Sequence, residues 1–160
     1  MSSRSVTADL YRRTCSLFAT GITVITTVDA NNHPHGLTVN SFSSVSLDPP
    51  LVLVCIDLKN ALLGHFLTTA SFAVNILADN QEAISRRFST AAQNRFHGID
   101  WTRGDSGSPL LAGVLAEMEC AVTKTLEAGD HAVLIGEVRR AAWREGKPLL
   151  YFNSAYQTLP

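Results

Sequence analysis

The sequence lacks the features that mark several specialised classes of protein. Among its 160 residues there is no run of about 18 apolar side chains, so neither a transmembrane helix nor a membrane partner is expected. There is no excess of positive charge either, because 13 basic and 14 acidic residues give a formal net charge of −1. A nucleic-acid partner, which needs a basic surface, is therefore not expected.

Cysteine is scarce, and Cys15, Cys55 and Cys120 form neither an even set nor a Cys-x-x-Cys motif. This argues against a disulfide framework and against a zinc or redox motif, so no metal site is expected. The apolar run after Arg12 and Arg13 is interrupted by threonine and glycine, unlike the core of a signal peptide. Together these observations favour a reducing cytoplasm.

Apolar residues, in contrast, are abundant. Hydrophobic residues make up 46% and charged residues 17% of the chain, which excludes intrinsic disorder. Residues 1–160 are enough for a single domain with a full core. So much apolar surface with so little charge further indicates an oligomer or a large ligand pocket.

The pattern of apolar and turn-forming residues predicts a chain made mostly of strands. A first helix is expected over residues 6–19, capped by Thr7 and ended by Gly21, with Leu17 and Phe18 on its apolar side. Further helices are expected over 60–66 and 80–89, and strands over 22–28, 37–47, 51–57 (fully buried), 71–77, 114–129, 130–145 and 147–152. Because most strands follow one another directly, they predict a mainly β fold with covering helices, an antiparallel β-barrel rather than a doubly wound sheet.

Motifs for nucleotide and metal chemistry are absent, and one motif is misleading. The sequence has no Gly-x-Gly-x-x-Gly, no P-loop and no His-Glu-x-x-His. Residues Gly104–Pro109 resemble the segment around the nucleophile of chymotrypsin-like serine proteases, with Ser106 in the nucleophile's place. That chemistry needs a histidine base and an aspartate, and no histidine here has that family's sequence setting. A turn rich in glycine and serine is the favoured interpretation.

Residues 36–47, Gly-Leu-Thr-Val-Asn-Ser-Phe-Ser-Ser-Val-Ser-Leu, carry no charged side chain and are rich in hydroxyl groups. Short uncharged donors suit a flat ring with polar edges, such as the isoalloxazine of a flavin, and stabilise the negative charge of its reduced form. An edge strand that faces water would show the same composition. The residues alone leave both interpretations open.

Four blocks of the sequence, in this order, resemble the flavin reductase family, the small reductase components of two-component flavin-dependent monooxygenases. The resemblance runs from about residue 18 to residue 151 and is carried by Gly36–Asp57, Arg87–Trp101, Ser108–Cys120 and Gly129–Val138. It implies an antiparallel split β-barrel of the FMN-binding type and a homodimer. It also implies hydride transfer from NADH or NADPH to FMN or FAD, with reduced flavin passed to a partner monooxygenase.

The resemblance also assigns residues to the flavin site. Along the ring and ribityl chain it places Thr38, Val39, Asn40, Ser41 and Ser43, followed by the strand residues Cys55, Ile56 and Asp57. On the phosphate side it places Asn60, Arg87, Phe88 and Ser89. An arginine can pair with phosphate through two hydrogen bonds, but Arg86 precedes Arg87, and one of the two is expected on a solvated helix face. The carboxylate of Asp57 would repel a phosphate unless it points away.

The segment Gly129-Asp130-His131 matches the block that lies beside the nicotinamide in this family. His131 is the candidate catalytic residue, because imidazole can donate a hydrogen bond to the carboxamide or move a proton near neutral pH. A Gly-Asp pair between two strands is also typical of a hairpin turn, and both interpretations are compatible. The alternative is a flavin- or haem-binding split barrel without reductase activity. Residues 151–156 depart from the family's usual ending, so no site residue is assigned there.

Overall fold

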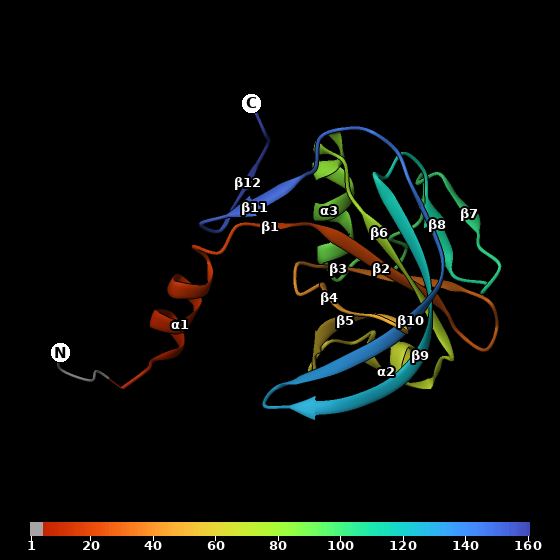
Figure 1. Ribbon diagram of the computed structural model, residues 1–160, viewed down its shortest axis with the longest axis horizontal. Coiled ribbons are helices and arrows are strands. Elements are labelled where there is room, and N and C mark those ends of the chain that lie inside the picture. The colour runs from red at the N-terminus through yellow and green to blue at the C-terminus, as the bar shows by residue number, and fades with distance from the viewer. Residues whose placement is uncertain (1–4) are drawn as a thin grey trace.

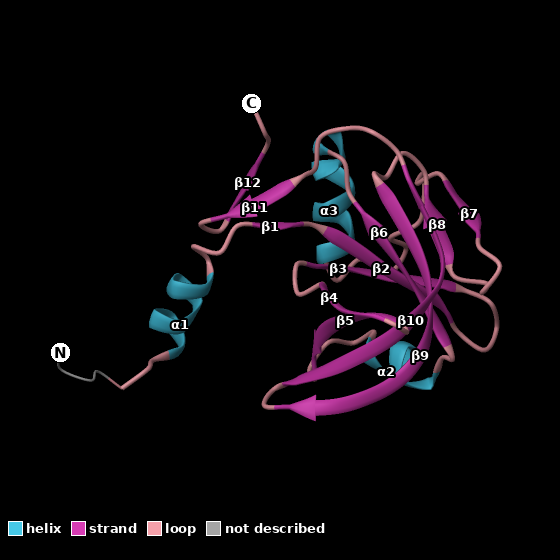
Figure 2. Cartoon of the chain, viewed as in Figure 1, coloured by secondary structure: helices cyan, strands magenta, loops and turns pink. Residues whose placement is uncertain are grey.

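Strands dominate the structure, a computed structural model that describes residues 5–160 (Figures 1 and 2). The helices are α1 (Ala8–Cys15), α2 (Leu63–Thr68), η1 (Asp79–Gln81) and α3 (Glu82–Ser89). The strands are β1 (Thr20–Gly21), β2 (Thr23–Val28), β3 (Pro34–Val39), β4 (Ser43–Leu47), β5 (Pro50–Asp57), β6 (Ser71–Ile76), β7 (Trp101–Arg103), β8 (Pro109–Leu111), β9 (Ala116–Ala128), β10 (His131–Trp143), β11 (Leu150–Phe152) and β12 (Ala155–Gln157). The expected mainly β fold with a few helices is confirmed.

The largest sheet is antiparallel throughout and has the strand order β3-β2-β6-β9-β10-β5-β4. It curls so that its two ends share one core, where Leu37 and Val39 of β3 belong to the same apolar cluster as Val54 and Ile56 of β5. Within residues 5–160 no backbone ladder joins β3 to β4 or β5, so the barrel is split. The predicted antiparallel split barrel is therefore confirmed.

Two helices cover the barrel. α2 inserts Leu63 and Phe66 into the core of the barrel, and α3 packs Phe88 into a second apolar cluster beside β2. Figure 1 shows α3 alongside β3 and β6, and α2 at the opposite end of the barrel. No helix within the described residues is long and apolar enough to cross a membrane.

α1 differs from the predicted first helix in length and in burial. Thr7 caps it as expected, but the helix ends at Cys15, and Gly21 lies in β1 rather than at a helix end. None of its residues is buried, and Figure 1 shows the helix standing away from the barrel. Leu17 and Phe18, expected on an inward side, are consequently 60% and 78% exposed.

The strands differ from the prediction in three places. Residues 37–47 form the end of β3 and all of β4, with a break at 40–42, and β3 already begins at Pro34, three residues before the predicted strand. β5 is not fully buried, because alternate residues point into the barrel and outward. Most of its outward residues are also apolar, and for this reason the sequence predicts a strand that is buried on both faces. The segment 90–112, for which the sequence predicts no strand, contains the β7–β8 hairpin.

The C-terminal segment differs most. Instead of one strand over 147–152, it forms the short hairpin β11–β12, which joins β1 in a separate three-stranded sheet. Its two-residue turn, Asn153-Ser154, has φ values of 50° and 61°. Two consecutive residues with positive φ are what a tight hairpin turn of type I′ requires.

Candidate functional site

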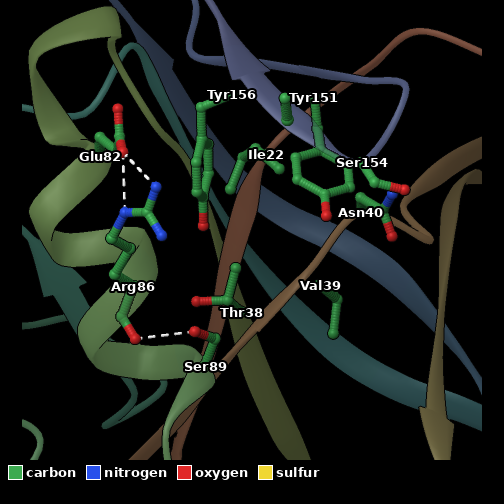
Figure 3. A pocket seen from close by; sticks show the side chains of 11 residues that line it. Ile22, Thr38, Val39, Asn40, Glu82, Arg86, Ser89, Tyr151, Ser154 and Tyr156 are labelled. Carbon is green, nitrogen blue, oxygen red and sulfur yellow. Dashed lines mark hydrogen bonds and ion pairs between the residues drawn. The ribbon is translucent and has the colours of Figure 1, made fainter. Parts of the chain in front are cut away.

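A cavity of about 630 Å³, here called the main cavity, opens between the end of β3, α3 and the C-terminal hairpin (Figure 3). It is lined by Ile22, Thr38, Val39, Asn40, Glu82, Arg86, Ser89, Tyr151, Ser154, Ala155 and Tyr156. Pockets of about 300–1,000 Å³ are typical of small-molecule sites. The structure thus brings four residues assigned to the flavin, Thr38, Val39, Asn40 and Ser89, to one cavity.

The end of β3 forms the uncharged wall of the main cavity. The hydroxyl of Thr38 donates a hydrogen bond to the carbonyl of Ser85 in α3 at 2.7 Å, and this bond ties strand to helix. The carbonyl of Val39 accepts a second bond, at 2.9 Å, from the buried hydroxyl of Thr23 in β2. Because both bonds lie within the chain, this wall is fixed before any ligand arrives.

α3 forms the charged wall and separates the two adjacent arginines. Arg86 lines the main cavity, where a guanidinium nitrogen lies 2.6 Å from a carboxylate oxygen of Glu82. The same guanidinium lies 4.7 Å from the centroid of the Tyr156 ring. Arg87 lies outside the lining and donates a hydrogen bond to the carbonyl of His97. The cation available inside the cavity is therefore Arg86.

The C-terminal hairpin forms the third wall, lined by Tyr151, Ser154, Ala155 and Tyr156. The Tyr156 hydroxyl lies 2.8 Å from Ser85 Oγ, and the two tyrosine rings pack edge to face with centroids 5.4 Å apart. The sequence pattern assigns no site residue here. Asn153-Ser154 between Tyr151-Phe152 and Ala155-Tyr156 is a signal for the hairpin, but nothing local in the sequence places that hairpin against α3.

Ser41 and Cys55 lie together outside the main cavity. The Ser41 hydroxyl donates to the Cys55 carbonyl at 2.9 Å and accepts from the Cys55 N–H at 3.0 Å. It thereby extends the β4–β5 ladder one step beyond the pair of Ser43 with Leu53. Burial raises the pKa of the Cys55 thiol, which disfavours a reactive thiolate. The Ser43 side chain is exposed and bonds locally to the next carbonyl.

Ile56 and Phe88, both assigned to the flavin, have their side chains in the core. Ile56 is 1% exposed and Phe88 is 0% exposed. The Phe88 ring packs edge to face on Phe96, with centroids 4.9 Å apart, and Phe96 packs on Trp101 in the same way. These buried side chains do not reach a ligand-accessible surface, and they pack behind the strands and the helix that form the walls.

The segment assigned to the nicotinamide forms the turn between β9 and β10. Gly129 has a φ of +63°, a left-handed conformation that favours glycine. Nδ1 of His131 lies 2.7 Å from Oδ1 of Asp130, and this hydrogen bond, followed by the charge of His131, lowers the pKa of the Asp130 carboxyl. The imidazole is therefore held in one orientation at an exposed position.

Asp57 and Asn60 meet the same turn from β5, because the register of the sheet sets His131 opposite Asp57. The Asp57 carboxylate accepts the N–H of Lys59 at 2.7 Å, and the Asn60 side chain accepts the N–H of Leu62 at 2.9 Å. Each of these side chains therefore stabilises the local turn that begins at its own residue. Figure 1 shows this end of the barrel apart from α3 and the C-terminal hairpin, so the assigned residues fall into two separate groups.

The protease-like segment 104–109 is a turn, as the composition indicates. The N–H and the hydroxyl of Ser106 both donate to Oε1 of Glu119 at 2.7 Å. A side chain at Gly104 would collide with this carboxylate, which explains the glycine. Ser106 thus forms hydrogen bonds to the buried carboxylate of Glu119 and has no histidine partner of the kind that a serine nucleophile needs.

A split barrel with a preformed cavity at its edge defines a class of small-molecule-binding proteins. The family described as "Flavin reductase like domain" matches residues 15–160 of the chain. The chain therefore belongs to the flavin reductase-like family, as its four sequence blocks imply.

Named relatives and a solved structure agree with this membership. The chain is 40% identical over 146 residues to the FMN reductase (NADH) SmoA of Agrobacterium fabrum, covering 91% of this chain and 83% of the relative. It is 40% identical over 141 residues to the reductase component of the flavin-dependent trigonelline monooxygenase of Acinetobacter baylyi, covering 88% of this chain and 46% of the relative. The NADH:FAD oxidoreductase SgcE6 of Streptomyces globisporus, solved with NAD and FAD fragments, is similar with a TM-score of 0.91 at 34% identity, covering 99% of this chain and 98% of that one. The chain spans about half the length of several relatives that it matches, between 39% and 55% of three of them.

Proposed function

We propose that this protein is an NAD(P)H-dependent flavin reductase, which transfers hydride from a reduced nicotinamide to FMN or FAD. The observation that carries this proposal is the main cavity, which has a volume of about 630 Å³ and is lined by the uncharged end of β3 and by Arg86. Membership of the flavin reductase-like family and relatives named as NADH-dependent FMN or FAD reductases support it.

The residues of the main cavity fit a flavin. Val39 and Ile22 offer apolar surface to a ring, and Asn40 offers an amide to its carbonyl edge. Arg86 offers a forked donor to a phosphate, once its guanidinium exchanges Glu82 for the ligand. A bound flavin supplies the hydride-accepting ring, and the chain supplies its position, its hydrogen bonds and the exclusion of water.

Within this proposal the assigned residues have two roles. Thr38, Val39, Asn40 and Ser89 contact the flavin, and Arg86 makes the phosphate contact that the resemblance assigns to Arg87. Ser41, Ser43, Cys55, Ile56 and Phe88 act by fixing the strands and the helix behind the site. The bonds of Ser41 to Cys55 and the burial of Phe88 support this division.

The nicotinamide is assigned to the turn Gly129-Asp130-His131, with Asp57 and Asn60 beside it. The bond between Asp130 and Nδ1 of His131 orients the imidazole and leaves Nε2 to face the carboxamide. His131 is 44% exposed, so a ligand can reach it. It is the residue to which we assign a direct contact with the nicotinamide nucleotide, whose reduced ring must reach from this turn to the flavin in the main cavity.

The proposal includes a homodimer. The adjacent residues Leu17 and Phe18 are 60% and 78% exposed, and neighbouring exposed apolar side chains mark an interaction surface. α1 leads directly into β1, which pairs with β11 beside the main cavity, so we expect the flavin site near this interface. Light scattering at micromolar concentration is expected to give twice the chain mass of 17.3 kDa, and a 17.3 kDa species would contradict the dimer.

We further propose that the chain is one domain, acts in the cytoplasm and passes reduced flavin to a monooxygenase. The relative from Acinetobacter baylyi, named as the reductase component of a monooxygenase, supports the last step. The three free cysteines, of which Cys15 is exposed, fit a reducing compartment.

The test is the oxidation of NADH and of NADPH by the purified protein, followed by absorbance, with and without added FMN or FAD. Oxidation that requires both protein and flavin is the expected result. A flavin- or haem-binding barrel without reductase activity would retain ligand binding but leave the nicotinamide unoxidised, and that outcome would overturn the proposal.

A further inference from the structure

A cluster of imidazole and carboxylate groups lies where the turn after β2 meets α2, apart from the residues that line the main cavity. Asp29 belongs to this turn, His35 to β3 and His65 to α2. One ligand-type atom from each, a carboxylate oxygen or an imidazole nitrogen, lies within 4.8 Å of the other two. The sequence predicts no metal site because it contains no Cys-x-x-Cys and no His-Glu-x-x-His motif, and only the fold brings His65 to Asp29 and His35.

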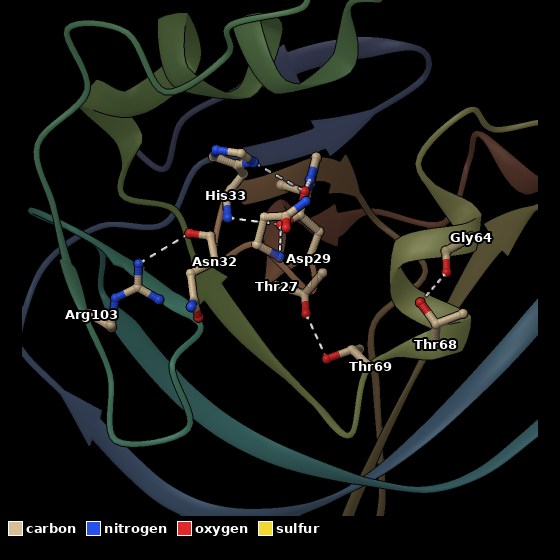
Figure 4. A network of polar contacts seen from close by, with 10 residues as sticks. Thr27, Asp29, Asn32, His33, Gly64, Thr68, Thr69 and Arg103 are labelled. Atoms are coloured by element: carbon tan, nitrogen blue, oxygen red, sulfur yellow. Dashed lines mark hydrogen bonds and ion pairs between the residues drawn. The ribbon is translucent and has the colours of Figure 1, made fainter.

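The two carboxylate oxygens of Asp29 have different partners. Oδ1 accepts the backbone N–H groups of Asn31 and His33 at 2.8 and 3.0 Å, which fixes the carboxylate on its turn (Figure 4). Oδ2 lies 3.1 Å from Nε2 of His35 and 3.5 Å from Nδ1 of His33. The backbone bond from His33, and then the bond from His35, lower the pKa of this carboxyl. The turn therefore presents one negatively charged oxygen to imidazole nitrogens.

The two imidazoles of the cluster are stacked. The ring centroids of His35 and His65 are 3.7 Å apart, with planes inclined by 10°. Burial, followed by the charge of His35, lowers the pKa of His65. The backbone of His65 is held because its helix buries Leu63 and Phe66 in the core. A hydrogen bond of 3.1 Å between Thr27 and Thr69 also ties β2 to the end of that helix (Figure 4).

We propose that Asp29, His35 and His65 form a binding site for a divalent first-row transition metal such as Zn²⁺. Zinc bonds of about 2.0–2.2 Å place the ligand atoms of a tetrahedral site about 3.3–3.6 Å apart. The distance of 3.1 Å from Oδ2 of Asp29 to Nε2 of His35 is close to this range. Imidazoles together with a carboxylate favour zinc and its neighbours over Mg²⁺ and Ca²⁺.

Coordination requires one local movement. The lone pair of an imidazole nitrogen lies in the ring plane, so the His65 ring must turn out of the stack while its backbone stays in place. A second cavity of about 350 Å³, lined on one side by Asp29, His33 and His35, provides an entry path for the ion. The bonds to Oδ1 of Asp29 hold the oxygen ligand in position, as outer-shell contacts do in metal sites.

The test measures Zn²⁺ binding to tag-free protein by equilibrium dialysis, without flavin or nicotinamide, so that its result is independent of the proposed function. Wild type is expected to bind one Zn²⁺ per chain. His65→Gln and Asp29→Asn are expected to weaken binding at least about tenfold, since even outer-shell changes at metal sites cost about 10–100-fold. His97→Ala, which removes an exposed imidazole outside the cluster, is the matched control and is expected to bind as wild type does.

Thermal melting gives a second readout. Because an ion that binds only the folded state raises its stability, Zn²⁺ is expected to raise the Tm of wild type and of His97→Ala more than that of either cluster variant. Absence of Zn²⁺ binding to wild type would overturn the proposal. Equal binding and an equal Tm shift in all four proteins would also overturn it, because the ion would then bind elsewhere.

Discussion

The main cavity and the turn between β9 and β10 differ in how the chain builds them. The main cavity gathers Ile22, the end of β3, one face of α3 and the C-terminal hairpin, which are distant in the sequence. The turn consists of three consecutive residues, Gly129-Asp130-His131, with Asp57 opposite on β5. The first region depends on tertiary packing, whereas the second is nearly complete in the local sequence.

This difference predicts how the two regions respond to substitution. Residues behind the main cavity stabilise the fold and set the shape of the cavity, so substitutions there are expected to affect folding and flavin binding. Side chains at the turn are exposed, so changes there affect the nicotinamide and leave the barrel intact. The predictions below are ordered from the largest expected effect to the smallest.

The largest effect is expected from Phe88→Ala, behind the main cavity. Removing a fully buried ring costs about 3–5 kcal/mol of the free energy of unfolding, because the core does not close over the space. Chemical denaturation measures this loss. If Phe88 instead stacks on the flavin, the variant will unfold as wild type does and lose only flavin affinity, which would contradict its place in the core.

The adjacent arginines give a matched pair on one helix. Arg86→Ala is expected to weaken flavin binding about 10–150-fold, because a hydrogen bond to a charged group contributes about 1.5–3 kcal/mol. Arg87→Ala is expected to leave flavin affinity within about twofold, since its guanidinium bonds to the carbonyl of His97 outside the main cavity. Flavin titration of both variants measures the difference. A larger loss in Arg87→Ala would return the phosphate contact to the residue that the family resemblance assigns.

His131→Ala tests the turn. Losing one or two hydrogen bonds of about 0.5–1.5 kcal/mol each is expected to lower kcat/KM for the nicotinamide by up to about a hundredfold. Flavin affinity and Tm are expected to stay close to wild type, because the side chain is outside the core. Steady-state kinetics and flavin titration on the same variant separate the two effects. Unchanged turnover would remove His131 from the catalytic site.

The smallest effect concerns pH and Asp130. Its pKa is lowered in the folded state by the bond to His131, so the carboxylate contributes stability above the unfolded pKa of about 3.9. That contribution is lost as the pH falls through the lowered pKa of the folded state. Asp130→Asn is therefore expected to make the Tm slightly less dependent on pH below about pH 4. If the Tm of Asp130→Asn falls with decreasing pH as steeply as that of wild type, the bond contributes nothing measurable to stability.

The sequence predicts the barrel well because strand patterns and turn residues are local. The Thr7 cap and the turn after Ala128 both appear where the sequence places them. The sequence fails at Gly21 because the end of α1 is set by a backbone bond from Ser16 rather than by a glycine. The sequence also predicts wrongly that β5 is buried on both faces, because apolar residues on an outward face give the same sequence pattern as buried residues.

The candidate site was less predictable because its walls meet only in the folded chain. Thr38, Val39 and Asn40 are identifiable from an uncharged stretch, but which of Arg86 and Arg87 lines the main cavity depends on which face of α3 packs on the barrel. Tyr151 and Tyr156 enter the site through a hairpin that docks against α3, where the hydroxyls of Tyr156 and Ser85 share a hydrogen bond. No local pattern in the sequence encodes that long-range contact.

The central claim is that the chain positions a reduced nicotinamide to pass hydride to flavin. The most direct measurement is anaerobic rapid mixing of the protein and flavin with NADH, and with NADH deuterated at the transferable position of C4, followed by flavin absorbance. The expected result is bleaching of the flavin that requires the protein and is slower with the deuterated nucleotide. Flavin that binds to the protein but is bleached no faster than in protein-free solution would contradict the claim.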